Sequence, residues 1–240
     1  MTDALLGFAI PVLIALGAVA LVGVLVIRGI PLMLDRRRYY RSAYAGITET
    51  TWTAARKDEG LRGEYQLTRE LERIAGHKRF LCNCYVPKED GTTSEIDVLM
   101  ITQAGIFVFE MKNYSGWIFG SQDDYQWTQV FPNKRKERFY NPLKQNATHV
   151  LTLQRYLQGF GPIPYYPIVV FGRQCTLKKV TVSPESVVLP LDSVGRVVQT
   201  LGYPVLTEYQ VDMVWSQLAP LTQVSPEIKN AHIQRVSRSR

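Results

Sequence analysis

The chain has 240 residues, of which 46% are hydrophobic and 20% are charged, and its formal net charge is +7. This composition supports a sizeable core and excludes a chain that is disordered throughout. The excess of positive charge favours an anionic partner, such as nucleic acid or a lipid surface, over a basic one.

The cysteines point to a reducing compartment. Cys82, Cys84 and Cys175 form no CxxC pair, so neither a disulfide framework nor a structural zinc site is indicated. Because residues two apart on a strand point the same way, Cys82 and Cys84 are expected to share one face.

A transmembrane helix is the first predicted element. Residues 4–27 carry no charge, and a helix needs roughly 20 apolar residues to cross the hydrocarbon core. The alternative is a cleaved signal peptide, which would have basic residues before a shorter apolar region, whereas the early charge here is Asp3. Arginines follow the apolar run instead, so the positive-inside rule predicts a single-pass protein of the inner or plasma membrane, with its N-terminus outside and the remainder in the cytoplasm.

The rest of the chain is predicted to form a linker, one domain and a tail. Residues 28–56 are expected to be a basic juxtamembrane linker whose Arg36–Arg38 region contacts anionic lipid headgroups. A globular domain is expected over 57–222, followed by a basic, disordered tail over 223–240. In chain order, the pattern predicts a helix over 63–74, strands over 79–86, 95–101, 105–111, 115–120 and 124–131, a helix that begins at Asn141, strands over 165–172 and 186–190, and helices over 191–202 and 207–218.

The hairpin within residues 94–116 carries charges where a buried strand should be apolar. Strand alternation places Glu110 and Lys112 on one face, and antiparallel pairing through the turn at 102–105 would bring Asp97 near them. Two neighbouring carboxylates repel each other, and a divalent cation relieves that repulsion. We therefore expect Asp97 and Glu110 to bind Mg²⁺ or Mn²⁺, which would activate water for phosphodiester hydrolysis beside Lys112. The alternative is an exposed Glu–Lys pair on an edge strand, because short motifs carry a high false-positive risk.

Four stretches together resemble a known family: GE at 63–64, EID at 95–97, GIFVFEMKNYSG at 105–116 and NPLKQN at 141–146. In this order they are similar to the nuclease-related domain (NERD) family, which is itself similar to the PD-(D/E)xK nucleases, over roughly residues 60–175. The resemblance implies a restriction-endonuclease-like α/β core, with a central mixed β-sheet flanked by helices. One departure is Ile96, which stands where the wider nuclease group has a proline; it removes no ligand.

The same resemblance implies a catalytic set. Glu64 corresponds to the acid of the first helix and Asp97 to the strand acid. Glu110 and Lys112 correspond to the ExK pair, and Gln145 corresponds to the polar residue of the following helix.

The helix that begins at Asn141 offers two polar residues one turn apart. Gln145 alone has a plainer interpretation as a solvated helix residue. His149 lies on the same face as Gln145, but a lone helical histidine is usually structural, so we leave it out of the catalytic set.

A basic and aromatic segment over 131–142 precedes this helix. Cations alternate there with aromatic rings, as in surfaces that combine phosphate contacts with base stacking. The alternative is a solvated hairpin tip, because charge runs usually face water. The residues expected to contact nucleic acid are Lys134, Arg135, Lys136 and Arg138.

The sequence thus predicts a membrane-anchored cytoplasmic nuclease that depends on Mg²⁺ or Mn²⁺. The rival interpretation is a non-catalytic module that binds nucleic acid or a protein partner beside the membrane. The two differ in chemistry, because an enzyme needs Glu110 and Lys112 together whereas a binder needs only the basic surface.

Reporter fusions test the predicted topology. The arginines after the apolar run predict that the C-terminus lies in the cytoplasm. A C-terminal reporter that works in the cytoplasm should therefore be active, and one that works only outside the cytoplasm should be inactive. Activity of a C-terminal reporter that works only outside the cytoplasm would contradict the assignment.

Overall fold

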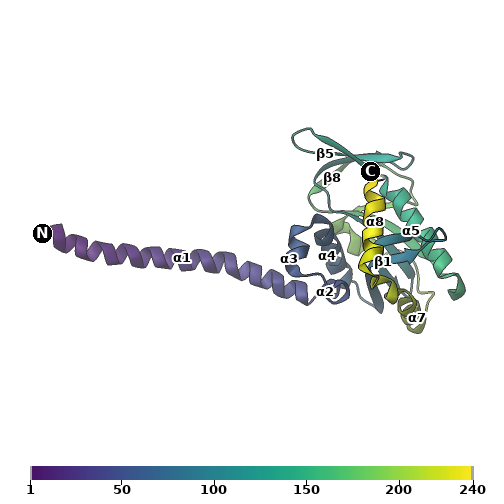
Figure 1. Ribbon diagram of the computed structural model, residues 1–240, viewed down its shortest axis with the longest axis horizontal. Helices are drawn as coiled ribbons and strands as arrows, with labels where there is room; N and C mark the ends of the chain where they lie inside the picture. The colour runs from purple at the N-terminus through teal and green to yellow at the C-terminus, as the bar shows by residue number, and fades with distance from the viewer. Residues whose placement is uncertain (1, 239–240) are drawn as a thin grey trace. The chain divides into compact units, whose positions relative to one another are not determined.

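The computed structural model describes residues 2–238, and the chain divides into two units, Met1–Arg41 and Ser42–Arg240 (Figure 1). The first unit contains one long helix, α1 (Thr2–Tyr40). Among the described residues, Ile14–Tyr40 is the one helical stretch that is long and apolar enough to cross a membrane, with a mean hydropathy of 2.2. Membrane crossing itself stays a prediction.

The predicted linker over 28–56 is largely helical. Helix α1 continues to Tyr40, and α2 (Ala43–Thr48) and α3 (Trp52–Lys57) follow in the second unit. The hydroxyl of Ser42 accepts a hydrogen bond from the Ala45 amide at the start of α2. The hydroxyl of Thr51 caps α3 in the same way. Ser42 and Thr51 therefore begin two short helices inside the predicted linker.

The second unit is built on a five-stranded mixed sheet with the order β1-β2-β3-β7-β9. Strands β1 (Lys78–Pro87), β2 (Thr93–Thr102) and β3 (Gly105–Lys112) pair antiparallel. Strand β3 pairs parallel with β7 (Tyr165–Phe171), and β7 pairs parallel with β9 (Val187–Pro190). The expected mixed α/β architecture is confirmed, and β3 is an inner strand.

Helices cover both faces of this sheet (Figure 1). Helices α5 (Pro142–Tyr156) and α7 (Glu208–Leu218) cover one face, where Val108 of β3 is buried in one cluster with Leu153 and Val214. Helix α4 (Glu59–Glu72) lies against the other face, where Gly63 meets the side chain of Met111. Shorter helical segments are η1 (Gln158–Phe160), η2 (Leu191–Ser193), α6 (Val194–Val198) and η3 (Ala219–Thr222).

A second mixed sheet has the order β6-β5-β4-β8. Strands β4 (Gly116–Ser121), β5 (Gln126–Val130) and β6 (Lys136–Tyr140) pair antiparallel, and β8 (Cys175–Thr181) joins β4 in parallel. Ile118 and Trp127 from this sheet are buried with Val169 and Phe171 of β7. One face of the second sheet therefore packs against the first sheet, and the other face remains outside.

Strand β1 is interrupted beside the acidic residues of β2. Asn83 has a φ of 52°, and the pairing of β1 with β2 skips its position. Asparagine tolerates this left-handed conformation better than most residues. Cys82 contacts Thr68 of α4, whereas Cys84 packs in the cluster under α5 and α7. The expectation that the two cysteines share one face is wrong, because the backbone between them leaves the extended conformation at Asn83 and the alternation of side chains is interrupted there.

The structure also differs from the expected disorder of the tail over 223–240. Helix α8 (Pro226–Arg238) begins after Ser225, whose carbonyl accepts bonds from the Ile228 and Lys229 amides. Pro226 takes the first helical position, which suits its fixed φ. A polar sequence can form such a helix because the backbone groups are satisfied locally.

The packing between β4 and β5 leaves no room for a side chain at Gly120. A Cβ added there would lie 2.3 Å from Cγ of Trp127, whose buried ring is stacked on Phe171 with the centroids 6.1 Å apart. We expect Gly120→Ala to lower the free energy of unfolding by about 1–3 kcal/mol, since overpacking forces neighbours to shift. Thermal melting of the full chain measures this. The control Gly159→Ala adds a Cβ with nothing within 4 Å, and equal melting temperatures for the two variants would contradict the prediction.

Candidate active site

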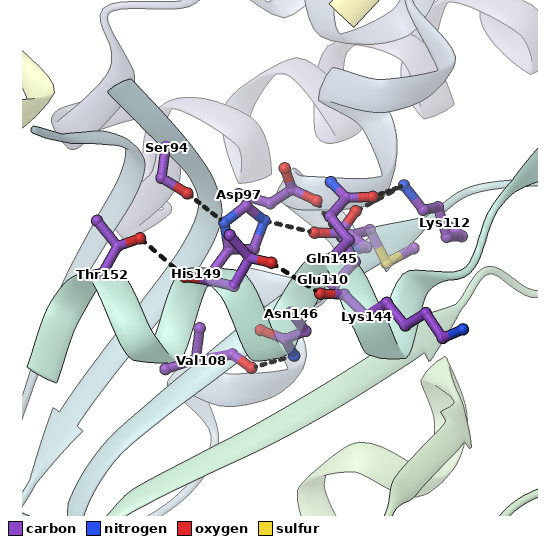
Figure 2. A network of polar contacts seen from close by, with 12 residues as sticks. Ser94, Asp97, Val108, Glu110, Lys112, Lys144, Gln145, Asn146, His149 and Thr152 are labelled. Carbon is purple, nitrogen blue, oxygen red and sulfur yellow. Dashed lines mark hydrogen bonds and ion pairs between the residues drawn. The ribbon is translucent and has the colours of Figure 1, made fainter. Parts of the chain in front are cut away.

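Asp97, Glu110 and Lys112 lie together where the pairing of β2 with β3 ends (Figure 2). The register pairs Val98 with Phe109, and one further step sets Asp97 opposite Glu110. Lys112 Nζ lies 2.6 Å from Glu110 Oε1, and the Glu110 side chain is 1% exposed. The alternative of an exposed pair on an edge strand is therefore wrong.

Helix α5 adds Gln145 and His149 to this cluster (Figure 2). Lys112 Nζ donates a hydrogen bond to Gln145 Oε1 at 3.2 Å. His149 Nε2 lies 3.1 Å from Glu110 Oε2, and its Nδ1 lies 2.7 Å from Ser94 Oγ. His149 thus contacts the central acid directly, although the sequence prediction leaves it out. The available signal was its spacing of one turn from Gln145.

Glu64 approaches the acids from α4 on the other side of the sheet. The hydroxyl of Tyr44 in α2 donates a hydrogen bond to Glu64 Oε2 at 2.9 Å. Burial raises the pKa of Glu64 to about 7, and the charges of Glu95 and Asp58 add to this, whereas hydrogen bonds from Tyr44 and Asn83 oppose it. No motif in the sequence pointed to Tyr44 or Asn83.

The acids of the site differ in how readily they ionise. Burial raises the pKa of Asp97 well above its usual value, and the negative charges of Glu110 and Glu64 raise it further. Burial acts in the same direction on Glu110, but Lys112 and His149 outweigh it and hold the pKa of Glu110 below its usual value. Burial disfavours the charge of Lys112, yet Glu110 raises its pKa above the usual value. A charged Glu110–Lys112 pair therefore lies beside two carboxyls that resist ionisation.

The donor set suits a Mg²⁺ ion held in an open site. Among the side chains that the structure describes, no three from His, Cys, Asp or Glu lie together so as to hold a metal. Asp97 Oδ2 accepts the Met111 amide at 2.8 Å, and both Glu110 oxygens contact Lys112 or His149. Because Mg²⁺ commonly takes one or two carboxylates and keeps its waters, Asp97 and Glu110 fit such an ion, whereas a closed protein cage does not fit.

The residues predicted to contact nucleic acid lie on the second sheet and take no part in the polar network of Figure 2. Two of them are on the edge strand β6 and two are in the turn before it, and all are exposed. Arg135 pairs with Glu137 at 3.0 Å and lies over the ring of Phe131. The four residues are Lys134, Arg135, Lys136 and Arg138.

Comparisons with known proteins identify the family of this chain. Residues 59–172 match the family model described as a nuclease-related domain. An uncharacterized protein of Bacillus anthracis is 30% identical over 181 residues, which are 74% of this chain and 84% of that protein. No solved structure matches the chain. The sequence, the fold and these matches together show that the chain belongs to the nuclease-related domain (NERD) family.

Proposed function

We propose that this protein hydrolyses phosphodiester bonds of nucleic acid with a bound Mg²⁺ or Mn²⁺ ion, and that its N-terminal helix anchors it in a membrane. The observation that carries the proposal is the Glu110–Lys112 pair, with its charges 2.6 Å apart on an inner strand beside Asp97. A buried ion pair is a weak stabilising device, because apolar side chains of similar volume often replace it at little cost. Its presence is better explained by chemistry than by stability.

Each residue of the site has a proposed role. Asp97 and Glu110 would hold the metal, which when bound supplies Lewis acidity and an easily deprotonated water. The Lys112 ammonium, held by Glu110 and Gln145, would orient the water or neutralise the charge that develops on phosphorus. Glu64 would complete the acidic side of the site.

His149 is a positioning residue in this proposal. Its Nε2 contacts one Glu110 oxygen while Lys112 contacts the other, so the carboxylate is held from both sides. Ser94 fixes the ring of His149 through Nδ1. Such outer contacts set the orientation of a metal ligand.

Membership of the nuclease-related family supports nucleic acid as the partner. The exposed hairpin residues would bind phosphates without reading bases, because lysine and arginine contacts to the backbone carry no sequence information. Those residues are Lys134, Arg135, Lys136 and Arg138.

Cleavage assays of the full chain test the proposal. Wild-type cleavage should require Mg²⁺ or Mn²⁺ and stop with EDTA. Asp97→Asn and Glu110→Gln should abolish it by weakening metal binding, whereas Lys112→Ala should retain Mn²⁺ binding in calorimetry and lose most of the rate. The matched control is Lys144→Ala, since Lys144 bonds to the Asp123 carbonyl instead.

Two outcomes would contradict this reading of the site. The wild type would bind no divalent ion even in the presence of nucleic acid, or Glu110→Gln would bind and cleave normally. Circular dichroism of each variant separates a loss of chemistry from a loss of fold.

The Tyr44–Glu64 hydrogen bond predicts a pH-dependent change in stability. Removing the hydroxyl should raise the pKa of Glu64 above about 7, because that bond opposes the effect of burial. A carboxyl with a raised folded-state pKa loses stability as the pH rises from the ordinary pKa of 4.5 to the folded-state pKa. A higher folded-state pKa extends this loss to higher pH, so Tyr44→Phe should lower the melting temperature more at pH 8 than at pH 5. The melts are run without divalent ions. The exposed control Tyr209→Phe should show no such pH dependence, and an equal effect of Tyr44→Phe at both pH values would count against the prediction.

A further inference from the structure

We propose that the outer face of the β6-β5-β4-β8 sheet binds single-stranded nucleic acid, with unpaired bases stacked on Trp117 and Tyr140 and phosphates held by cations of β6 and β8. The inference rests on the proposed function and names the class of its substrate. By the outer face we mean the side of this sheet that carries Trp117, Lys136, Arg138, Tyr140 and Lys179.

Strand register separates this face from the buried one. Trp117 pairs with Val130, and Val130 pairs with Lys136, so these side chains point the same way. Their neighbours Ile118 and Trp127 point the opposite way and are fully buried. The outer face is therefore turned to solvent.

The charge of the outer face is positive and uncompensated. The one carboxylate in the four strands, Glu137, pairs in register with Gln129 on the buried side and contacts Arg135. Among residues 2–238, four exposed cations of β6 and β8 have no ion-pair partner, so their charges are available to an anionic ligand: Lys136, Arg138, Lys178 and Lys179. Their number and grouping match a phosphate backbone.

Aromatic rings between these cations point to unpaired bases. Trp117 is 43% exposed and Tyr140 is 40% exposed, although both lie within regular strands. Tyr125 packs edge-on against Tyr140 with the ring centroids 5.3 Å apart. Bases of a single strand can stack on such rings, whereas a duplex keeps the faces of its bases covered. The face therefore suits a single strand better than a double helix.

The outer face is closely connected to the catalytic cluster. Strand β3 ends at Lys112 and β4 begins at Gly116, so Trp117 lies at most about 18 Å from Lys112 along the chain. Tyr114, in the short connection, packs on Phe139 of β6 with the centroids 4.8 Å apart. This connection is ordered by packing, so a bound strand would lie at a fixed distance from the acids.

An anionic bilayer is the main rival for this face, because it also attracts cations and interfacial aromatic rings. Polar side chains favour nucleic acid. Thr128 pairs with Phe119 and Thr176 pairs with Trp117, so hydroxyls lie among the rings on the outer face. Hydroxyls can bond to phosphates and base edges, but they gain nothing on insertion among acyl chains.

Binding of fluorescent oligonucleotides to the full chain in detergent, with EDTA to prevent cleavage, tests the proposal. A single strand should bind at least about ten-fold more tightly than a duplex of the same length. Trp117→Ala and Tyr140→Ala should each weaken single-strand binding about ten-fold, the effect expected from losing one base–aromatic stack. Lys179→Ala should reduce the dependence of binding on salt. The control Tyr203→Ala, which removes an exposed ring outside the sheet, should change none of these values.

Acrylamide quenching identifies what covers the face. The emission of Trp117 is the part of the tryptophan fluorescence that is lost in Trp117→Phe. A bound single strand should protect this emission from acrylamide, whereas vesicles that contain anionic lipid should not. Shielding by anionic vesicles alone would assign the face to the membrane and overturn the proposal. Equal binding of single strand and duplex, unaffected by Trp117→Ala, would also overturn it.

The two proposals can fail separately. If the protein cleaves nucleic acid with Mg²⁺ while Trp117→Ala binds like the wild type, the proposed function stands and this inference fails. If single strands bind as expected in EDTA but no divalent ion supports cleavage, the inference stands and the hydrolytic function fails.

Discussion

The Glu110 carboxylate is the group on which the site depends. It is buried on an inner strand, where an isolated charge would be unfavourable, and it is accommodated because Lys112 and His149 contact its two oxygens. The need to pair both Glu110 oxygens requires α5 to lie beside β3, since His149 on α5 contacts one of them. Asn146 helps to hold α5 in place, because its amide donates to the carbonyls of Val108 and Ile168 on two neighbouring strands.

The same arrangement explains why acids from opposite sides of the sheet can act together. If β1 were regular, the sheet would lie between Glu64 on α4 and Glu110, which faces α5. The left-handed backbone at Asn83 breaks that regularity, and the Asn83 side chain bonds to Glu64. Glu64 then lies near enough to raise the pKa of Asp97. A residue in a sparsely populated backbone conformation can redirect side chains in this way, and such residues cluster at functional sites.

Much of the fold followed from local sequence patterns, and the parts that did not depend on distant pairing. Strands such as 105–111 were predictable because apolar runs ended at clear turns. Strand β8 was not predicted, because CTLKKVT is half exposed and is stabilised by pairing with β4, far away in sequence. The tail was assigned to disorder from its polarity alone, which does not exclude the helix α8.

The residues of the candidate site also fall into those that a local pattern predicts and those that depend on distant parts of the chain. Asp97, Glu110 and Lys112 could be grouped by alternation within one hairpin, whereas Glu64 and Gln145 required a family resemblance. The role of His149 was missed because its partners, Ser94 and Glu110, are 55 and 39 residues away. Tyr44 was missed for a related reason, since it lies before the residues that match the family.

The position of Tyr44 has a practical consequence for preparing the second unit on its own. A truncation at the start of the family match would keep every acid of the site but delete α2, and the buried Glu64 would lose a hydrogen-bond donor. A truncation at Ser42 keeps both the donor and the cap of α2 while removing the apolar helix. An expressed fragment should therefore begin before Tyr44, because the Tyr44 hydroxyl donates a hydrogen bond to Glu64. Sequence similarity alone would suggest a later start, at residue 59.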